Sequence, residues 1–247
     1  MRTIVFNEER ITLDSGYFFG RGVFETILVK RKPVFLKEHI ERLNKGIRVL
    51  ELGDEILLED ILNIIDKYSI KNCVLKIAVS EKNIVIETRD NKYKTGDYLK
   101  GFSLKLSNIN RNSKSKLTYI KSTNYLDNIL QREEALKRGY DEVLFLNEKG
   151  FVAEGSVSNI FLIKENKIYT PKVESGLLPG VVRKFIIDEF NVIEKEIIIE
   201  DLFNADEIFI TNSLLGVMGI SKLEDKILSK NKITIGIREK YEEIISN

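Results

Sequence analysis

The sequence predicts a mixed α/β fold that is divided into two domains. The chain has 247 residues, of which 43% are hydrophobic, and this is enough for one large core or two smaller ones. Apolar residues recur along the chain both at helical spacings and in short strand-like runs. A polar segment at 108–116 contains almost nothing that could be buried. We therefore expect a smaller N-terminal α/β domain over residues 1–112 and a larger C-terminal α/β domain over residues 113–247.

The N-terminal domain is predicted to combine strands with two helices. A short strand is expected near Thr3–Phe6, and the run Phe24–Val29 is expected to turn at Lys30–Pro33 as part of a hairpin. Apolar residues between Leu36 and Leu50 recur at spacings of three and four, which indicates an amphipathic helix. The remaining elements expected here are a helix over 56–68 and strands over 73–79 and 84–88.

The C-terminal domain is predicted to begin with a helix, because Leu126, Ile129, Leu130 and Ala135 share helical spacing. Pro179 suits the first turn of a later helix that runs through Phe190, since the N–H group that proline lacks would have no partner there. The other expected elements are strands over 143–146, 159–163, 167–170 and 208–211, and a C-terminal helix from about residue 235.

Charge and composition exclude several classes of function. The 39 basic and 38 acidic residues leave a net charge of +1, so no excess positive field is available to hold nucleic acid. A single cysteine, Cys73, cannot form an internal disulfide, and a single histidine excludes every metal site that needs two. A Ser-His-Asp triad would have to use His39. The N-terminus lacks signal-peptide features and no apolar run could span a bilayer, so we expect a cytoplasmic protein without a membrane partner.

Three local patterns are candidates for chemistry. Lys121 lies between an apolar run and a polar turn, where a partly desolvated amine is a good nucleophile toward aldehydes. Glu154 follows an apolar strand and precedes a hydroxyl-rich turn, and its carboxylate could hold a proton on a heterocyclic nitrogen. The Gly-rich turn at 175–183 leads into a helix whose first N–H groups suit a phosphate, for which Arg42 is a possible second ligand. Each pattern alone is ordinary, but together they match pyridoxal phosphate.

The sequence also resembles a known family, the fold-type IV (class IV) aminotransferases, whose two-domain fold is that of D-amino-acid aminotransferase. The motifs that carry the resemblance are Phe19-Gly20-Arg21-Gly22-Val23-Phe24-Glu25-Thr26, His39-Ile40-Glu41-Arg42-Leu43, Ile120-Lys121-Ser122-Thr123-Asn124-Tyr125-Leu126, Glu154-Gly155-Ser156 to Asn159, and Leu178-Pro179-Gly180 to Arg183. They occur in the family's order and span nearly the whole chain.

The resemblance implies pyridoxal 5′-phosphate as the cofactor and assigns residues to it. Lys121 would carry the cofactor through its amine and move the proton, and Glu154 would bind the pyridine nitrogen. The remaining cofactor-binding residues implied by the resemblance are Arg42, Ser156, Val181, Val182 and Ser213, with no metal. Two departures are visible: Val182 stands where relatives often have Thr, and Arg21 stands where Asp is common.

Within the family, the segment Ile210 to Met218 is most similar to 4-amino-4-deoxychorismate lyases, which release pyruvate and form 4-aminobenzoate for folate synthesis. The alternative is a branched-chain or D-amino-acid aminotransferase. The D-amino-acid enzymes use an Arg-x-His pair for the substrate carboxylate, and with His39 as the only histidine this pair cannot exist. The resemblance also implies a homodimer that acts on a small molecule. Two roles stay open: the acid for the leaving oxygen (Thr26, Ser156 or Tyr125), and the ligand of the substrate carboxylate (Arg21, Arg89 or Lys30).

Overall fold

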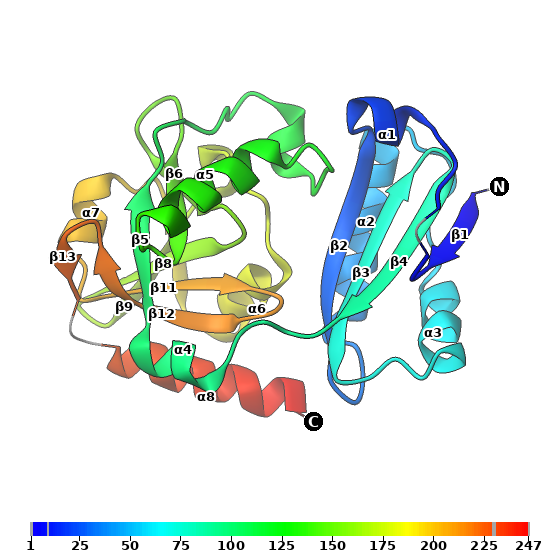
Figure 1. Cartoon of the computed structure of the whole chain (residues 1–247). Coiled ribbons are helices and arrows are strands. Elements are labelled where there is room, and N and C mark those ends of the chain that lie inside the picture. The colour runs from blue at the N-terminus through cyan, green and yellow to red at the C-terminus, as the bar shows by residue number, and fades with distance from the viewer. Residues whose placement is uncertain (1, 9, 229–230, 247) are drawn as a thin grey trace. The chain divides into compact units, whose positions relative to one another are not determined.

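The computed structural model describes residues 2–8, 10–228 and 231–246, and the chain divides into two compact units (Figure 1). Unit 1 comprises Met1–Lys92 together with Ile120–Tyr125, and unit 2 comprises Tyr93–Tyr119 together with Leu126–Asn247. This grouping differs from the division predicted after residue 112. The chain leaves unit 1 twenty residues earlier, and the segment that carries Lys121 belongs with unit 1 rather than with the C-terminal part.

Unit 1 is a sheet with helices packed on one face. The strand order is β1-β4-β3-β2, in which β1 runs parallel to β4 and the other pairs are antiparallel. The hairpin of this sheet is therefore β3–β4, while β2 pairs with β3. The elements are β1 (Thr3–Phe6), α1 (Ser15–Phe19), β2 (Gly22–Val29), α2 (Leu36–Val49), α3 (Leu58–Lys67), β3 (Cys73–Ser80) and β4 (Asn83–Arg89).

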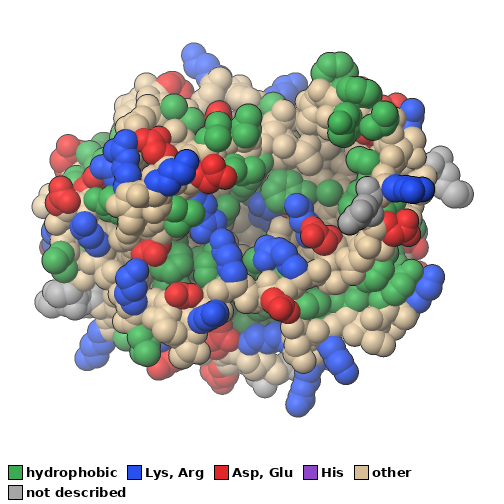
Figure 2. All heavy atoms as spheres, in the orientation of Figure 1, with side chains coloured by type: hydrophobic (Ala, Val, Ile, Leu, Met, Phe, Trp, Pro, Cys, Tyr) green, Lys and Arg blue, Asp and Glu red, His purple; other side chains and the backbone are tan. Residues whose placement is uncertain are grey.

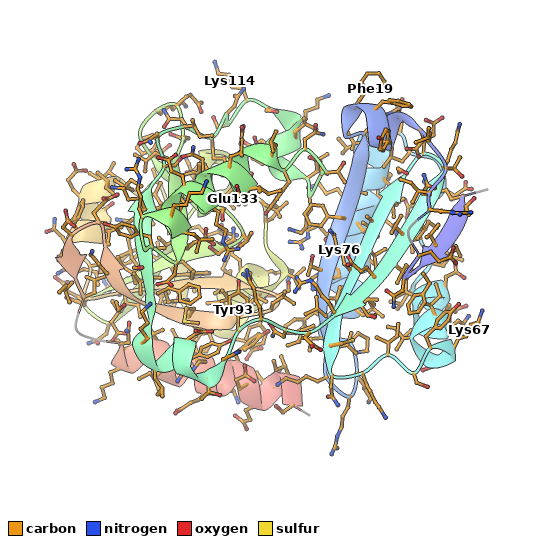
Figure 3. The ribbon with its side chains drawn as sticks, viewed as in Figure 1. Phe19, Lys67, Lys76, Tyr93, Lys114 and Glu133 are labelled. Atoms are coloured by element: carbon orange, nitrogen blue, oxygen red, sulfur yellow. The ribbon has the colours of Figure 1, made fainter. Side chains whose placement is uncertain are left out.

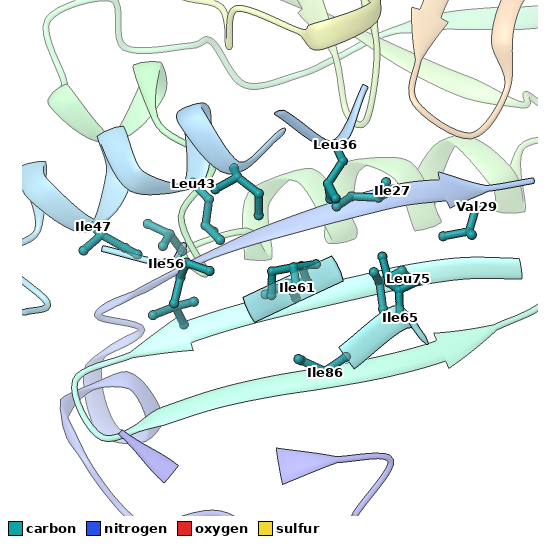
Figure 4. Close-up of a cluster of buried hydrophobic side chains, with 14 of the residues drawn as sticks. Ile27, Val29, Leu36, Leu43, Ile47, Ile56, Ile61, Ile65, Leu75 and Ile86 are labelled. Atoms are coloured by element: carbon teal, nitrogen blue, oxygen red, sulfur yellow. The ribbon is translucent and has the colours of Figure 1, made fainter. Parts of the chain in front are cut away.

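The core of unit 1 lies between this sheet and the helices α2 and α3. Figure 4 shows Leu43 and Ile47 of α2, Ile61 of α3, and Ile27 and Leu75 of the strands among the buried side chains. Along β2, the odd-numbered residues from 23 to 29 are buried and the even-numbered residues from 24 to 28 are only partly buried. This alternation follows from the two-residue period of a strand and leaves the second face of the sheet without core contacts.

The segment that carries Lys121 is bound to the edge of β2 through its backbone. The Phe24 N–H donates to the Lys121 carbonyl and the Thr123 N–H to the Gly22 carbonyl, both at 2.9 Å, and Val23 and Ser122 form an isolated antiparallel bridge. The partners are about 100 residues apart in sequence, so no local pattern could predict this pairing.

Unit 2 is a larger sheet with strand order β10-β9-β8-β11-β12-β5-β6-β7, and β13 pairs with β12 outside this path. Its strands are β5 (Phe102–Leu106), β6 (Glu142–Leu146), β7 (Val152–Gly155), β8 (Asn159–Lys164), β9 (Lys167–Pro171), β10 (Val192–Lys195), β11 (Glu207–Asn212), β12 (Gly216–Leu223) and β13 (Lys226–Ile227). Its α-helices are α4 (Thr95–Lys100), α5 (Leu126–Lys137), α6 (Val181–Glu189), α7 (Ile199–Phe203) and α8 (Lys232–Ser246).

The predicted mixed α/β class is confirmed, and most predicted elements occur within a few residues of their expected bounds. Pro179 is an exception, because α6 begins at Val181 with Gly180 as its N-cap and the proline precedes the cap. Strands β5, β7 and β12 are among the elements that the sequence did not predict. β5 and β7 are short, and β12 contains Gly216 and Gly219, a residue type that strands disfavour. None of the helices in the described ranges is long and apolar enough to cross a bilayer.

Candidate active site

In unit 1, the Lys121 side chain lies against aromatic rings. Its Nζ atom is 4.4 Å from the centre of the Phe24 ring and 5.2 Å from that of Tyr125, and the two rings meet edge to face at 5.2 Å. The lysine is partly buried. The backbone pairing with β2 fixes the position of its Cα atom, and the rings restrict its side chain. A lysine amine in a fixed position is a group that can form a covalent link with an aldehyde.

The same unit contains a buried network of Glu25, Arg42 and His39. Arg42 donates from Nε to Glu25 Oε1 and from Nη2 to Glu25 Oε2, each at 2.7 Å. His39 Nδ1 lies 2.7 Å from Glu25 Oε2. Glu25 has no exposed side-chain surface, whereas the Arg42 side chain is 13% exposed. The carboxylate therefore orients the guanidinium through a two-pronged ion pair, which is the strongest hydrogen-bonding geometry of the two groups.

Charge in this network is set by burial and by neighbouring groups. Burial opposes ionisation of Glu25, but the charges and hydrogen bonds of Arg42 and His39 outweigh it and hold the pKa of Glu25 far below its usual range. Burial lowers the pKa of His39, and the positive charges of Arg42 and Lys121 lower it further against the opposing effect of Glu25. His39 is therefore neutral at pH 7 and donates its Nδ1 proton to Glu25. It supports the carboxylate that holds Arg42 and does not contact solvent.

In unit 2, Glu154 has contacts on both of its carboxylate oxygens. The Leu178 N–H donates to Oε2 at 2.9 Å, and Arg111 Nε lies 3.2 Å from Oε1. The Glu154 side chain is 10% exposed. A carboxylate oxygen accepts more than one hydrogen bond, so Glu154, oriented by these contacts, can also accept a hydrogen bond from a protonated ring nitrogen.

Arg111 is a site residue that the sequence did not indicate. Its guanidinium stacks on the Phe145 ring at 3.9 Å, and Nη1 donates to Asn128 Oδ1 at 2.9 Å. The polar composition of 108–116 predicts a boundary with little to bury, but the Arg111 side chain is only 13% exposed, and its backbone bridges to Asn147 of the same unit. Its planar cation packs on an aromatic face while it pairs with a carboxylate, which is typical of buried arginines.

A second missed residue, Glu25, left a signal in the sequence. It occupies the strand position between Val23 and Ile27, both of which point into the core. A carboxylate at such a position requires a buried cation or several donors. The spacing of His39 and Arg42, which share one face of α2, supplies these partners. The alternating pattern could therefore have identified the network.

The phosphate site expected at α6 has the features that an anion requires. Gly180 is the N-cap and provides no side chain, so no cap occupies the N–H groups of Val181 and Val182. A Cβ atom at Gly180 would lie 2.0 Å from Asn159 Oδ1, so only glycine fits. The Thr211 hydroxyl, near Ser213 in the chain, is buried and has no hydrogen-bond partner among the described residues. An uncapped helix start and an orphaned hydroxyl both suit a ligand with oxygen atoms.

Ser156 has partners other than a ligand in this structure. Its hydroxyl donates to Glu142 Oε1, and its backbone N–H donates to the same oxygen at 3.1 Å. Asn128 Nδ2 donates to the Ser156 carbonyl at 2.6 Å. Asn128 also accepts from Arg111, so these contacts link the turn after Glu154 to the arginine that pairs with Glu154.

Arg21, whose role the sequence left open, is engaged with the end of α2. Its Nε and Nη2 atoms donate to the Leu50 carbonyl at 3.1 and 2.9 Å, and Nη2 also reaches the Glu51 carbonyl at 3.3 Å. A cation beside the last carbonyls of a helix satisfies orphaned acceptors and interacts favourably with the helix dipole. Arg21 therefore stabilises α2.

Comparison with known proteins identifies the family of the chain. Residues 22–223 match the family model described as amino-transferase class IV. The chain belongs to the class IV aminotransferases. Members of this family depend on pyridoxal 5′-phosphate, which is therefore the cofactor of the chain. The residues present fit it: unit 1 offers a positioned amine, and unit 2 offers a carboxylate and an uncapped helix start.

Individual relatives differ in activity. The chain is 33% identical to an aminodeoxychorismate lyase of Bacillus subtilis, covering 86% of this chain and 80% of the relative. It is 26% identical to a candidate branched-chain-amino-acid aminotransferase of Methanocaldococcus jannaschii, covering 94% and 89%. A solved structure of a candidate 4-amino-4-deoxychorismate lyase from Legionella pneumophila matches with a TM-score of 0.86 and 27% identity, covering 97% and 98%. These proteins are similar to the chain but are named for two reactions.

Proposed function

We propose that the chain is a pyridoxal-phosphate-dependent 4-amino-4-deoxychorismate lyase that releases pyruvate and 4-aminobenzoate. The observation that carries the proposal is the 33% identity with the Bacillus subtilis lyase. The burial of His39 against Glu25 adds support, because the only histidine of the chain is then committed to the core of unit 1. A histidine that binds the carboxylate of a D-amino acid is therefore not available.

We assign the cofactor ligands as follows. Lys121 Nζ binds the cofactor's reactive carbon, and Glu154 holds the proton on the pyridine nitrogen. The N–H groups of Val181 and Val182, the Ser213 hydroxyl and the Arg42 guanidinium bind the phosphate, and the backbone around Ser156 supports Glu154. When bound, pyridoxal phosphate withdraws electrons from the carbon that bears the substrate amine.

The residues of the chain then move protons and hold charges. Once the substrate amine has taken its place on the cofactor, the released Lys121 Nζ would remove the proton from the amine-bearing carbon, and the neighbouring Phe24 and Tyr125 rings keep the lysine amine in place. Loss of the enolpyruvyl oxygen then completes an aromatic ring, which supplies driving force. An acid is needed at that oxygen. Ser156 is poorly suited because its proton is donated to Glu142, which leaves Thr26 and Tyr125 as candidates.

The deciding experiment measures two reactions with the purified holoenzyme. We expect pyruvate and 4-aminobenzoate to form in equal amounts from 4-amino-4-deoxychorismate when no 2-oxo acid is added as an amino-group acceptor. Transamination of branched-chain or D-amino acids with 2-oxoglutarate is the alternative, which similarity to the Methanocaldococcus jannaschii protein favours. Efficient transamination without pyruvate release would overturn the lyase proposal.

We also propose that the enzyme is a homodimer. Unit 1 exposes an apolar patch on α1, where Tyr17, Phe18 and Phe19 are 64, 60 and 79% exposed, and the patch is visible as green spheres at the upper right of Figure 2. Contiguous exposed apolar side chains of this size often mark an interface between proteins. Light scattering after size exclusion should give twice the mass of the chain, and the monomer mass at micromolar concentration would contradict the proposal.

A further inference from the structure

The turn that leads into β2 contacts two other segments of unit 1. It comprises Gly20, Arg21 and Gly22, and it follows Phe19, the last residue of α1, which is labelled in Figure 3. Gly20 has a left-handed conformation with a φ of 65°. Glycine restricts its own backbone less than any other residue, so a turn with a glycine on each side of Arg21 has little rigidity of its own. Its conformation therefore depends on its contacts with neighbouring segments.

The segment that carries Lys121 binds this turn through side chains as well as through its backbone. The Gly20 carbonyl accepts hydrogen bonds from Thr123 Oγ1 at 2.6 Å and from Asn124 Nδ2 at 2.8 Å. A Cβ atom at Gly20 would lie 2.8 Å from Asn124 Oδ1, so the two segments approach too closely for a side chain at this position. The Gly20 carbonyl therefore holds the chain two and three residues beyond Lys121.

The Arg21 side chain connects the same turn to the end of α2. Its Nε and Nη2 atoms donate to the carbonyl of Leu50, the C-cap residue of α2, at 3.1 and 2.9 Å. The Gly20 carbonyl and the Arg21 N–H belong to one planar peptide group, so an anchored Arg21 restricts the direction of that carbonyl. Arg21 therefore links the helix that carries Arg42 to the segment that carries Lys121.

We propose that Arg21 is a positioning residue for Lys121 and that it acts through the Gly20 carbonyl. The inference rests on the proposed role of Lys121, because an amine that reacts with a cofactor aldehyde must be held in a productive direction. If Arg21 only stabilised the end of α2, its removal would leave residues 121–124 unchanged. The two roles therefore differ in what happens to the lysine segment.

Hydrogen exchange of the holoenzyme measures the hold on this segment without using any catalysed reaction. The Thr123 N–H donates to the Gly22 carbonyl at 2.9 Å and reports on opening of the segment. Arg21 is exposed, so we expect Arg21→Met to fold. It should raise the exchange rate of the Thr123 N–H roughly 3- to 10-fold, as expected when one hydrogen bond of a support is lost. Arg21→Lys should restore most of the protection, because its cation can donate to the Leu50 carbonyl.

A second measurement concerns the lysine amine itself. Apoenzyme is mixed with pyridoxal phosphate, and the formation of the covalent link to Lys121 is followed by absorbance. Arg21→Met should slow this step roughly 3- to 10-fold, because the amine spends less time in the productive direction. Arg21→Lys should again approach the rate of the wild type.

A matched control lies at the same end of α2. Arg48 is in the last turn of the helix, its side chain is 58% exposed, and it pairs with Glu55 rather than with the turn. Arg48→Met removes the same charge from the same helix end. It should leave both the exchange of the Thr123 N–H and the rate of link formation unchanged.

A coupled variant tests the route through the Gly20 carbonyl. Thr123→Val combined with Asn124→Ala removes the two side-chain donors to that carbonyl. In this background, Arg21→Met should change the rate of link formation less than about twofold, because residues that act through one contact are not additive. A full additional effect of Arg21→Met would overturn the proposed route.

The outcomes separate this proposal from the assignment as a lyase. If Arg21→Met changes exchange and link formation no more than Arg48→Met does, Arg21 only caps α2 and the proposal is overturned. A wild type that forms no link with pyridoxal phosphate would overturn the role of Lys121 and this proposal together. Neither measurement uses the lyase reaction, so an absence of pyruvate release would overturn the lyase proposal alone.

Discussion

Both units pair a glutamate with an arginine beside a proposed cofactor ligand, but the two pairs differ in which partner stays accessible. In unit 1, Glu25 has no exposed surface and both its oxygens are bound by Arg42 and His39. The arginine keeps 13% of its side chain exposed. In unit 2, Glu154 is 10% exposed and is held by Arg111 and one backbone N–H. The carboxylate supports the cation in the first pair, whereas the cation supports the carboxylate in the second.

This difference shows that a motif does not by itself identify the functional member of an ion pair. Phe24-Glu25-Thr26 and Glu154-Gly155-Ser156 each present a glutamate next to small or apolar residues. Burial decides between them: both carboxylates have partners on both oxygens, but Glu25 has no exposed surface at which a ligand could reach it, whereas Glu154 is 10% exposed. Variants of each pair should therefore change different properties of the protein.

Lys121→Ala should have the largest effect, since it removes the amine that we assign to the reaction. The variant should fold, because the backbone hydrogen bonds between this segment and β2 do not involve the side chain. We expect the visible absorbance of the bound cofactor and all turnover to disappear. Absorbance spectra and the pyruvate assay measure both, and full activity in Lys121→Ala would exclude the assignment.

Glu25→Ala should mainly reduce stability. It leaves the Arg42 charge and the His39 donor without their buried partner, and breaking such a pair costs about 3–5 kcal/mol of the free energy of unfolding. Glu87→Ala is the matched control, because Glu87 is exposed on β4 of the same sheet and should cost less than about 0.5 kcal/mol. Urea denaturation of the two variants tests the contrast. A similar loss of free energy of unfolding in both variants would show that the buried network does not contribute to stability.

Glu154→Gln should mainly reduce activity. The amide retains the size of the side chain and can still accept from the Leu178 N–H, but it cannot stabilise a proton on the pyridine nitrogen. We expect turnover to fall on the order of 10²-fold, as for other groups that stabilise charge in a reaction. The free energy of unfolding should change less than in Glu25→Ala. Normal turnover in the Glu154→Gln enzyme would contradict the role assigned to Glu154.

The smallest expected effect is the dependence of stability on pH that His39, the only histidine of the chain, gives to unit 1. Burial holds the pKa of folded His39 below its ordinary value of 6.5. Below that pH the unfolded chain takes up a proton that the folded chain does not, so the free energy of unfolding decreases as pH falls. One group contributes at most about 1.4 kcal/mol per pH unit. Between about pH 7 and 5, the melting temperature should fall more steeply for the wild type than for His39→Gln. Equal slopes would refute the assignment of His39 as a buried, neutral histidine.

The sequence indicated part of the site because some functions depend on local chemistry. Lys121, Glu154 and the turn before α6 were selected from short patterns. The structure places Lys121 in a segment that pairs with β2 in unit 1, and it places Glu154 on β7 in unit 2. Arg111 could not be found in this way. Its contacts with Phe145, Asn128 and Glu154 join residues that are 17 to 43 positions apart, and its neighbours in sequence are polar.

The sequence by itself determined the mixed α/β class, most helices and strands, the family and its cofactor, because periodicity and motifs are properties of short segments. Only the tertiary structure decided which segments belong together. The residues around Lys121 pair with β2 across about 100 residues, and Arg111 lies beside Glu154, 43 positions later in the chain. The physical reason is that burial and pairing depend on neighbours in space, and these determine which charge is a support and which is available to a substrate.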